Sequence, residues 1–576
     1  MRSILKCSSI TALWAELVAE ELVRLGVKLV CIAPGSRSTP LVAACARHEG
    51  LEKVVCQDER SAGFYALGYG RAAGIPAAVI TTSGSAVANL FPSVVEASND
   101  RVPLLLLTAD RPPELRAVGA NQTIDQAKIF GGYTRSFVDI PVPDDRISLR
   151  YVLSTVDQAL ASSSKGPVHL NFMFREPFEP DVDQPFDRSI LKGIAAWAEH
   201  NNPLCRRVDL EAVMPLMRDS QSGIIVCGAI CDQEAELAVV RLSEKIGWPI
   251  LPDVLSNLRF HQSPAIANFF DFALLDAKLE SHVPDVVLQI GGRIVSKRLQ
   301  TFLDRGLSKA HIYIGDEPER FDPGCVVTHR VEGCARDLLC HASEGWHPEA
   351  ARRRMDASLR WHDNSEIVCT ELIRQEIDTS LSEITVARSL VRSLSSNHAL
   401  FCSVSMPVRD VNMFAEPHAD PPRLYANRGA SGIDGIVSSA CGVSKALEKR
   451  CVLLCGDLTF LYDTNGLGLI NSLDMPFVIV VVNNQGAGIF TMLNIHKQTD
   501  IFTPYWDAEH DVQLSKLCAA YELKHVKIDT LAHWNDVLAT LPNATEHMIV
   551  EVVSDKWENK KAHDHIREAV QRKFAS

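Results

Sequence analysis

Residues 451–490 read CVLLCGDLTFLYDTNGLGLINSLDMPFVIVVVNNQGAGIF, and this stretch decides the fold. It holds two short apolar runs, 452–455 and 477–482, and turn residues follow each of them. Uninterrupted runs of this kind are typical of buried parallel strands. A parallel pair needs a crossover long enough for a helix, which residues 465–473 can supply. The stretch therefore predicts one strand–helix–strand unit of a parallel sheet.

Polar side chains follow both predicted strands. Gly456-Asp457 follows the first strand and Asn483-Asn484 follows the second. Because ligands bind at the carboxyl ends of strands in open α/β sheets, we expect the carboxylate and the amide to lie side by side there. With a backbone carbonyl from the glycine turn 486–488, they form a hard oxygen set that suits Mg²⁺ bound to phosphate oxygens. Either pair alone is more often a simple turn, but the two together predict a site for a metal-bridged diphosphate.

Length and composition limit the other possibilities. A chain of 576 residues is too long for one core and should form about three domains. The net charge of -13 argues against a nucleic-acid partner, which would require a basic surface. The 16 cysteines form no C-x-x-C pair and lie mostly in apolar runs, as buried reduced thiols do. No apolar run approaches about 20 residues, so we expect a soluble, cytoplasmic protein that does not bind a membrane.

The alternation of strands and helices continues along the chain. It predicts an α/β fold of three doubly wound parallel-sheet domains, spanning 1–180, 205–343 and 367–576. Linkers are expected at 176–203 and 344–366, and a charged helix at 558–574. The strands expected in the first two domains are 28–33, 53–57, 77–82, 103–108, 167–172, 223–227, 285–290 and 311–314.

Two glycine-containing stretches look like nucleotide motifs but have the wrong context. Residues 68–73, GYGRAA, match a G-x-G-x-x-A pattern, but they fall inside a predicted helix rather than between a strand and a helix. Residues 291–298, GGRIVSKR, lack the spacing of a phosphate loop. A third stretch, 34–40, is a better anion site. There Arg37 precedes a helix that Ser38 or Thr39 can cap, with Pro40 as its first residue.

Four stretches carry a resemblance to a known family. They are CIAPGSRSTPL at 31–41, LTADRPPEL at 107–115 with GANQ at 119–122, ANRGASGIDG at 426–435, and the stretch 451–490. Together they resemble the 2-succinyl-5-enolpyruvyl-6-hydroxy-3-cyclohexene-1-carboxylate synthases, the thiamine-diphosphate-dependent enzyme family of menaquinone biosynthesis. The resemblance implies a pyrimidine-binding, a middle and a diphosphate-binding domain of the decarboxylase type. It also implies a homo-oligomer, at least a dimer and in the family a tetramer, with the cofactor between the first domain of one subunit and the third domain of its partner.

The resemblance also implies the chemistry. The family decarboxylates 2-oxoglutarate and adds the resulting four-carbon unit to isochorismate. Glu59 matches the glutamate whose carboxylate hydrogen-bonds the pyrimidine ring of the cofactor, so that the ring takes the proton from thiazolium C2. Asp457, Asn484 and the backbone oxygen of Gly486 match the ligands of Mg²⁺ or Mn²⁺.

The remaining matches concern the cofactor and the substrates. Arginine suits these substrates because it binds carboxylates bidentately and is permanently charged. The residues expected to contact the cofactor are Gly456, Leu458, Thr459, Ile433, Ile489 and Phe490. Those expected on the oxoglutarate side are Ser405, Arg409 and Arg428. Those expected on the isochorismate side are Ser36, Arg37, Arg111, Asn121, Gln122, Lys297 and Arg298.

One departure from the family and two alternative functions stay open at this point. The family often has consecutive glycines where this chain has Ala487, and a positive φ there would carry a steric cost. An acetohydroxyacid-synthase type of carboligase shares the domain order, but it would turn over pyruvate and needs fewer arginines. A non-catalytic paralogue that only binds thiamine diphosphate would have no need for Glu59.

Overall fold

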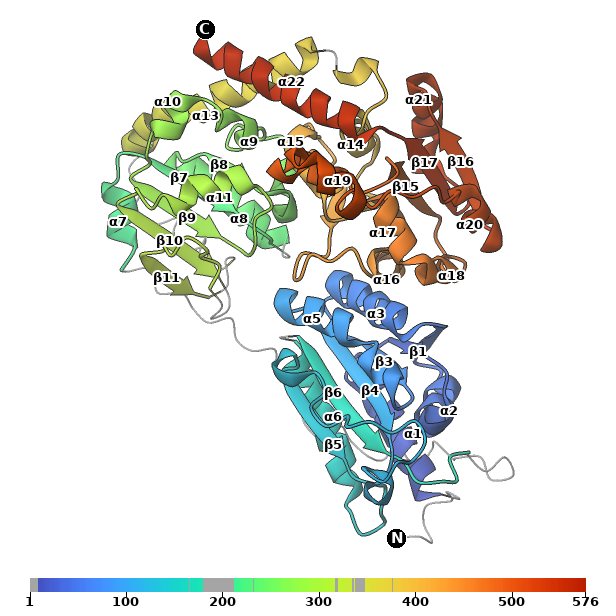
Figure 1. Cartoon of the computed structure of the whole chain (residues 1–576). Coiled ribbons are helices and arrows are strands. Elements are labelled where there is room, and N and C mark those ends of the chain that lie inside the picture. The colour runs from blue at the N-terminus through green and yellow to red at the C-terminus, as the bar shows by residue number, and fades with distance from the viewer. Residues whose placement is uncertain are drawn as a thin grey trace. The chain divides into compact units, whose positions relative to one another are not determined.

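The computed structural model describes residues 9–164, 166–179, 212–230, 233–315, 320–333, 336, 348–375 and 377–576 (Figure 1), with only the backbone described for 348–358. The chain forms two compact units. The first unit comprises Met1–Asn201, Asn427–Leu453 and Thr459–Phe477, and the second comprises Asn202–Ala426, Leu454–Leu458 and Val478–Ser576. The expected linker at 176–203 falls largely outside the described residues.

A six-stranded sheet in the first unit confirms the strands predicted for residues 28–172. Its order is β2-β1-β3-β4-β6-β5, and all neighbours are parallel. The inner strands are fully buried, which explains their continuous apolar runs. The strands are β1 Leu29–Ile32, β2 Glu52–Val55, β3 Ala77–Thr81, β4 Leu104–Asp110, β5 Ser136–Ile140 and β6 Pro167–Met173.

Helices cover this sheet in two groups. α1 Ile10–Arg24, α2 Thr39–Arg47 and α6 Leu149–Ser163 share one hydrophobic core with alternate residues of the strands. α3 Glu59–Ala73 and α5 Phe91–Asp100 contact each other, and α3 also contacts β1 and β3 (Figure 1). The short elements of this region are α4 Ser85–Ala88, η1 Ser36–Ser38, η2 Pro113–Leu115 and η3 Gly131–Tyr133.

Glycines allow α3 to pack closely against α16 Ile436–Leu447. A Cβ atom at Gly68 would lie 1.9 Å from the carbonyl oxygen of Ser439, and one at Gly442 would lie 2.0 Å from that of Tyr65. These distances are too short for any side chain, so the two backbones approach each other at glycines. The pattern GYGRAA thus belongs to a helix, as predicted, and its first glycine serves helix packing rather than a dinucleotide.

The second unit contains a parallel five-stranded sheet, in the order β11-β10-β9-β7-β8. Its strands confirm the three predicted at 223–227, 285–290 and 311–314, and they are β7 Gly223–Cys227, β8 Ile250–Pro252, β9 Val286–Ile290, β10 Ala310–Gly315 and β11 His329–Glu332. The helices around it are α7 Met214–Asp219, α8 Gln233–Ile246, α9 Phe270–Ala273, α10 Ala277–Ser281 and α11 Lys297–Asp304, with η5 Val254–Ser256 and η6 Leu258–Phe260.

The expected charged linker at 344–366 is wrong in its described part, because α13 spans Pro348–Arg374. Trp361, Val368 and Leu372 of this helix are buried in two hydrophobic clusters. These positions lie on one helical face, which the abundance of charged residues concealed.

The third sheet contains the two strands of the stretch 451–490 as neighbours. Its order is β13-β12-β14-β15-β17-β16. The strands are β12 His398–Cys402, β13 Arg423–Tyr425, β14 Arg450–Gly456, β15 Phe477–Asn483, β16 Lys524–Ile528 and β17 Met548–Val553. Its helices are α14 Glu383–Ser393, α15 Met406–Phe414, α19 Thr499–Tyr505, α20 Leu514–Ala520, α21 Leu531–Thr540 and α22 Lys556–Ala575, the last as predicted. The 3-10 turns are η7 Ile377–Thr379, η9 Gly488–Met492, η10 Asn494–Lys497 and η11 Leu541–Asn543.

The crossover between β14 and β15 differs from the single helix expected at 465–473. α17 Asp457–Tyr462 begins directly after β14 and is followed by η8 Thr464–Gly466 and α18 Leu467–Ile470. Asp463 interrupts the helix because its backbone is not helical and its carboxylate accepts the N–H of Ser438 at 2.8 Å. Three parallel sheets confirm the predicted fold class. No helix among the described residues is both long and apolar enough to cross a membrane.

Replacement of Gly68 by alanine tests the packing of α3 against α16. The added methyl group has no room beside Ser439, so we expect Gly68→Ala to lower the melting temperature, at a cost of about 1–3 kcal/mol for the forced backbone shift. Differential scanning calorimetry measures this. Gly132→Ala is the matched control, because a Cβ atom at Gly132 meets nothing within 4 Å. Equal melting temperatures for the two variants would contradict the close helix contact.

Candidate active site

Asp457 lies at the carboxyl end of β14 and is the first residue of α17. Its side chain is 2% exposed. Oδ1 accepts the N–H of Leu458 at 2.6 Å, and Oδ2 accepts the N–H of Gly486 at 3.0 Å. His510 Nε2 lies 3.2 Å from Oδ2. Burial raises the pKa of Asp457 above its usual value, and the two backbone N–H groups and His510 oppose this shift.

Asn484 follows β15 and presents an oxygen that has no hydrogen-bond partner among the described residues. Its Nδ2 donates to Glu383 Oε1 at 2.9 Å, whereas its Oδ1 is buried and accepts no hydrogen bond from the described residues. A buried acceptor left without a partner costs about 1–3 kcal/mol. A group from outside the chain is therefore expected to meet this oxygen.

The oxygen chemistry fits a divalent cation. Asp457 supplies a carboxylate, and Asn484 supplies an amide oxygen without a partner among the described residues. Gly486 supplies a backbone carbonyl that accepts the N–H of Gly488 at 3.1 Å. Mg²⁺ and Mn²⁺ bind sets of this kind. In the described part of the chain no three His, Cys, Asp or Glu side chains gather around one point, so a metal here would depend on the amide and the carbonyl.

The turn after Asn484 accommodates Ala487 without strain. Ala487 has φ −89, and the positive φ values fall on Gln485 at 57 and Gly486 at 157. A Cβ atom at Gly486 would lie 2.4 Å from the carbonyl oxygen of Asp507, which also accepts the N–H of Ala487 at 2.7 Å. The departure from consecutive glycines is therefore harmless, because the glycine is kept where the backbones approach.

The other residues expected around the cofactor lie close to these strand ends or before α16. A Cβ atom at Gly456 would meet nothing within 4 Å, so there is open space beside it. Thr459 is buried inside α17. The half-buried residues among those expected to contact the cofactor are Leu458, Ile433, Ile489 and Phe490.

Glu59 is the first residue of α3 and is half-buried. Its Oε2 accepts Asn89 Nδ2 at 3.3 Å. Asp58 caps the helix, because one oxygen of its carboxylate accepts the N–H of Arg60. The other oxygen accepts Asn465 Nδ2 at 2.8 Å. The helix end that carries Glu59 is thus fixed to the crossover that follows β14.

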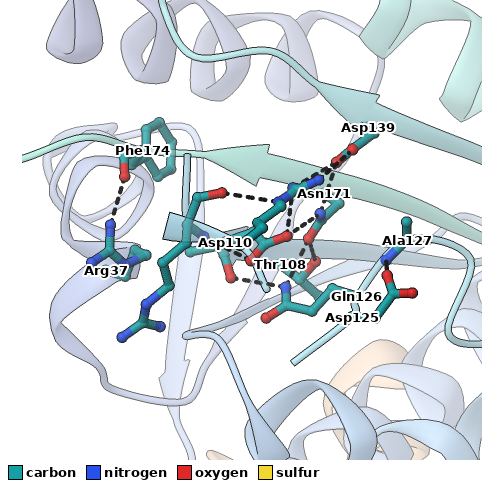
Figure 2. A network of polar contacts seen from close by, with 12 residues as sticks. Arg37, Thr108, Asp110, Asp125, Gln126, Ala127, Asp139, Asn171 and Phe174 are labelled. Atoms are coloured by element: carbon teal, nitrogen blue, oxygen red, sulfur yellow. Dashed lines mark hydrogen bonds and ion pairs between the residues drawn. The ribbon is translucent and has the colours of Figure 1, made fainter. Parts of the chain in front are cut away.

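Arg37 and Arg111 form a buried pair of like charges, each 7% exposed. Arg37 Nη1 donates to the carbonyl oxygen of Phe174 at 2.6 Å (Figure 2), and its guanidinium lies 4.7 Å from the ring centroid of Phe178. Burial lowers the pKa of both arginines, and the charge of Arg111 lowers that of Arg37 further. Arg37 Nε and Arg111 Nη1 are buried without a hydrogen-bond partner among the described residues. Two such cations with unused donors are a fitting site for an anion.

A polar network around Asp110 and Asn171 (Figure 2) holds the backbone of Arg111. Asp110 Oδ1 accepts the N–H of Arg111 at 2.7 Å, and Oδ2 accepts Asn171 Nδ2 at 2.9 Å and Arg116 Nη2 at 2.6 Å. Arg116 also pairs with Asp139 at 2.8 Å. Sequence reasoning missed this network. Its signal was a pair of polar residues, His169 and Asn171, inside the buried strand β6.

The same network reaches the turn that holds Gln122. Gln126 Nε2 donates to Asn171 Oδ1 at 2.8 Å, and its Oε1 accepts the N–H of Gly84 at 3.0 Å. Gln122 Nε2 donates to the carbonyl oxygen of Ser83 at 2.9 Å. Gln122 is therefore engaged within the protein.

Ser36 and Asn121, also expected on the isochorismate side, are exposed. Ser38 precedes α2 as predicted, but its hydroxyl donates to the carbonyl of Gly35 at 2.9 Å and caps no helix N–H. The start of α2 therefore differs from the predicted cap, although its proline lies in the first turn.

Two carboxylates of α5 hold the loop that carries Arg428. Glu96 accepts the N–H groups of Gly429 at 2.8 Å and Ala430 at 2.6 Å, and Asp100 accepts that of Arg428 at 3.3 Å. Burial raises the pKa of Glu96, and the two backbone N–H groups oppose the shift. Arg428 is half-buried. No sequence pattern pointed to Glu96, because the loop it binds lies more than 300 positions away in the chain.

The predicted substrate residues of the second unit have structural partners or are exposed. Ser405 has φ 69, an unusual backbone for a serine, and Arg409 donates to its carbonyl oxygen. Strained residues of this kind concentrate at functional sites. Arg298 pairs with Asp271, whereas Lys297 at the start of α11 is exposed. The roles expected for these residues stay predictions.

Comparison with protein families defines the class. Residues 14–129 match the thiamine pyrophosphate enzyme N-terminal TPP binding domain, residues 188–402 match the middle domain of thiamine pyrophosphate enzymes, and residues 410–552 match the C-terminal TPP binding domain. These matches follow the order of the three sheets. They define a thiamine pyrophosphate enzyme and confirm thiamine diphosphate as the cofactor.

Curated relatives narrow the class. Three proteins named 2-succinyl-5-enolpyruvyl-6-hydroxy-3-cyclohexene-1-carboxylate synthase are similar to the chain. The one from Salinibacter ruber is 42% identical over 99% of this chain and 98% of its own length. Those from Rubrobacter xylanophilus and Chlorobium limicola are 39% and 36% identical, over 96% of this chain and 97% and 96% of their own lengths. The chain belongs to this family of synthases, which are transferases, and the resemblance of the four stretches is confirmed.

Removal of Glu96 tests whether its carboxylate holds the loop of Arg428. In Glu96→Ala the N–H groups of Gly429 and Ala430 lose their acceptor, so we expect faster hydrogen–deuterium exchange in peptides covering 427–435. Glu114→Ala is the control, because Glu114 is exposed and pairs with the exposed Arg175. Unchanged exchange in Glu96→Ala would show that the loop is held by other contacts.

Proposed function

We propose that this protein decarboxylates 2-oxoglutarate and joins the resulting four-carbon unit to isochorismate by 1,4-addition. The products are 2-succinyl-5-enolpyruvyl-6-hydroxy-3-cyclohexene-1-carboxylate and CO₂, within menaquinone biosynthesis. Family membership over nearly the whole chain supports this reaction. The observation in the structure that carries it is the unpartnered Asn484 Oδ1 beside the strand end that holds Asp457.

In this proposal Asp457, Asn484 and Gly486 hold Mg²⁺ or Mn²⁺ against the diphosphate of the cofactor. The buried carboxylate compensates part of the cation's charge, and the amide oxygen gains the partner it lacks. Gly456, Leu458 and Thr459 lie directly beside Asp457 in sequence and line the diphosphate. Ile433, Ile489 and Phe490 supply apolar contacts to the rings.

Thiamine diphosphate supplies, when bound, the ring that stabilises the carbanion left by loss of CO₂. Glu59 holds a proton for the pyrimidine ring. Asn89 donates to Glu59 Oε2, so Oε1 is the oxygen that would serve the pyrimidine ring when the cofactor is bound. The half-buried position at a helix N-terminus keeps this carboxylate fixed in direction.

The arginines bind the carboxylates of the substrates. Arg37 and Arg111 take a carboxylate of isochorismate, because an anion offsets the repulsion that Arg111 exerts on Arg37. It also meets N–H donors that lack a partner among the described residues. Ser36, Asn121, Gln122, Lys297 and Arg298 complete that side. Lys297 is a stronger candidate than Arg298 for binding a substrate carboxylate, because Arg298 already pairs with Asp271. Ser405, Arg409 and Arg428 bind 2-oxoglutarate.

Assembly, domain limits and location are further parts of the proposal. The cofactor lies between the first domain of one subunit and the third domain of its partner, in a dimer or a tetramer of two dimers. Domain limits at 1–180, 205–343 and 367–576 agree with one sheet in each range. A cytoplasmic location is supported by the described cysteines, which are free thiols and mostly buried.

A four-component assay tests the reaction. We expect the purified protein to consume isochorismate and release CO₂ only when thiamine diphosphate, Mg²⁺ and 2-oxoglutarate are all present. Isochorismate is followed by its ultraviolet absorbance and CO₂ by a coupled assay. CO₂ release without loss of isochorismate would reject the acceptor. A higher kcat/KM with pyruvate than with 2-oxoglutarate would instead identify an acetohydroxyacid-synthase type of carboligase.

Replacement of Glu59 tests the proton-holding role. Glu59→Gln keeps the shape of the side chain but cannot exchange the proton, so we expect turnover to fall by about 10²-fold or more. Binding of thiamine diphosphate with Mg²⁺, measured by tryptophan fluorescence, should stay close to that of the unaltered protein. Full turnover in Glu59→Gln would reject this role and would leave a chain in which Glu59 serves only the start of α3.

A further inference from the structure

A buried carboxyl group lies behind Asn484. Glu383 is the first residue of α14 and is 5% exposed. Its Oε1 accepts two hydrogen bonds, from Asn484 Nδ2 at 2.9 Å and from Ser554 Oγ at 3.1 Å. The side chain of Glu383 points at Asn484 and contributes no oxygen to the metal set described above.

The contact determines which end of the Asn484 amide faces which way. The oxygen and the nitrogen of an amide are similar in size but opposite in hydrogen bonding, so an asparagine can bind in two orientations. Oε1 of Glu383 is an acceptor and can face only the NH₂ end. The reversed amide would set two oxygens against each other and would forfeit the hydrogen bond.

The protonation state of Glu383 does not change this argument. Burial raises its pKa to about 7, and the charge of Asp410 adds to the shift, whereas Asn484, Ser554 and His563 oppose it. Since Oε1 already accepts two donors, a proton on this carboxyl group resides on Oε2. Oε1 therefore faces the amide as an acceptor in both states.

We infer that Glu383 is a positioning residue that fixes the amide of Asn484 so that Oδ1 faces the divalent cation. This inference rests on the metal site of the proposed function. Without Glu383 the amide would lose the contact that distinguishes its two ends, and the NH₂ end would face the cation in part of the molecules. Residues that orient metal ligands in this way typically change metal affinity by about 10–100-fold when replaced.

Mn²⁺ binding tests the inference without reference to turnover. Free Mn²⁺ is measured by electron paramagnetic resonance during titration of the full-length protein with saturating thiamine diphosphate. Glu383→Gln has the same shape but can either donate or accept, so we expect Mn²⁺ to bind about tenfold more weakly or worse. Ser554→Ala is the matched control. It removes the other donor to Oε1 and leaves the contact with Asn484, so its affinity should stay near that of the unaltered protein.

A double variant separates orientation from a general structural effect. In Glu383→Gln with Asn484→Asp, the glutamine amide donates to one oxygen of the new carboxylate, and the other oxygen faces the metal. We therefore expect the double variant to recover Mn²⁺ affinity relative to Glu383→Gln. A purely structural role for Glu383 predicts no such recovery.

Each outcome decides one question. If the unaltered protein with thiamine diphosphate binds no Mn²⁺, the metal site of the proposed function is wrong. If it binds Mn²⁺ and Glu383→Gln binds equally well, the metal site stands and the positioning role is overturned. If circular dichroism shows that Glu383→Gln does not fold, the Mn²⁺ affinity of Asn484→Asp tests the positioning role instead. Two facing carboxyl groups should then weaken Mn²⁺ binding despite the added charge, and tighter binding would overturn the inference.

Discussion

The structure depends on one constraint, namely that a polar group removed from water must find a partner inside the protein. The constraint is strongest where buried parallel strands end, because each strand there passes from an apolar interior to a polar loop. Asp457 shows how it is met. Its carboxylate leaves water almost completely, and the N–H groups of Leu458 and Gly486 compensate for the lost solvation. The bond from Gly486 also fixes the glycine turn after β15 to the end of β14.

The same constraint explains the polar groups of the first sheet. Asp110, Asn171 and Arg116 form a network in which each buried polar atom that faces the others has a partner, and this network holds Arg111. Several other buried side-chain atoms of the described residues lack a partner, and three of them belong to residues that the sequence placed at the active site. Arg37 Nε, Arg111 Nη1 and Asn484 Oδ1 are unpartnered among the described residues. The two arginine atoms are donors, which suit an anion. The asparagine oxygen is an acceptor, which suits a cation.

Glycines in this chain serve backbone contacts that a motif search would misread. Gly68 lies in a pattern typical of dinucleotide binding, yet it allows α3 to touch the backbone of α16 at Ser439. Gly486 likewise allows the turn after β15 to pass the carbonyl of Asp507, and Ala487 keeps an ordinary backbone conformation there. The two glycines differ in context, since Gly68 lies within a helix and Gly486 lies in the turn after a strand.

The sequence by itself predicted many of the strands, the fold class, the family and the turn after β15, because apolar runs and strand-ending residues act locally. It did not reveal the helical nature of α13 or the break at Asp463, because the first depends on buried positions among many charges and the second on a bond to Ser438. Only the tertiary structure decided that Glu96 holds the loop of Arg428 and that Glu383 faces Asn484. These carboxylates act on residues 333 and 101 positions away, and no local pattern encodes a hydrogen bond that forms only when distant elements pack together.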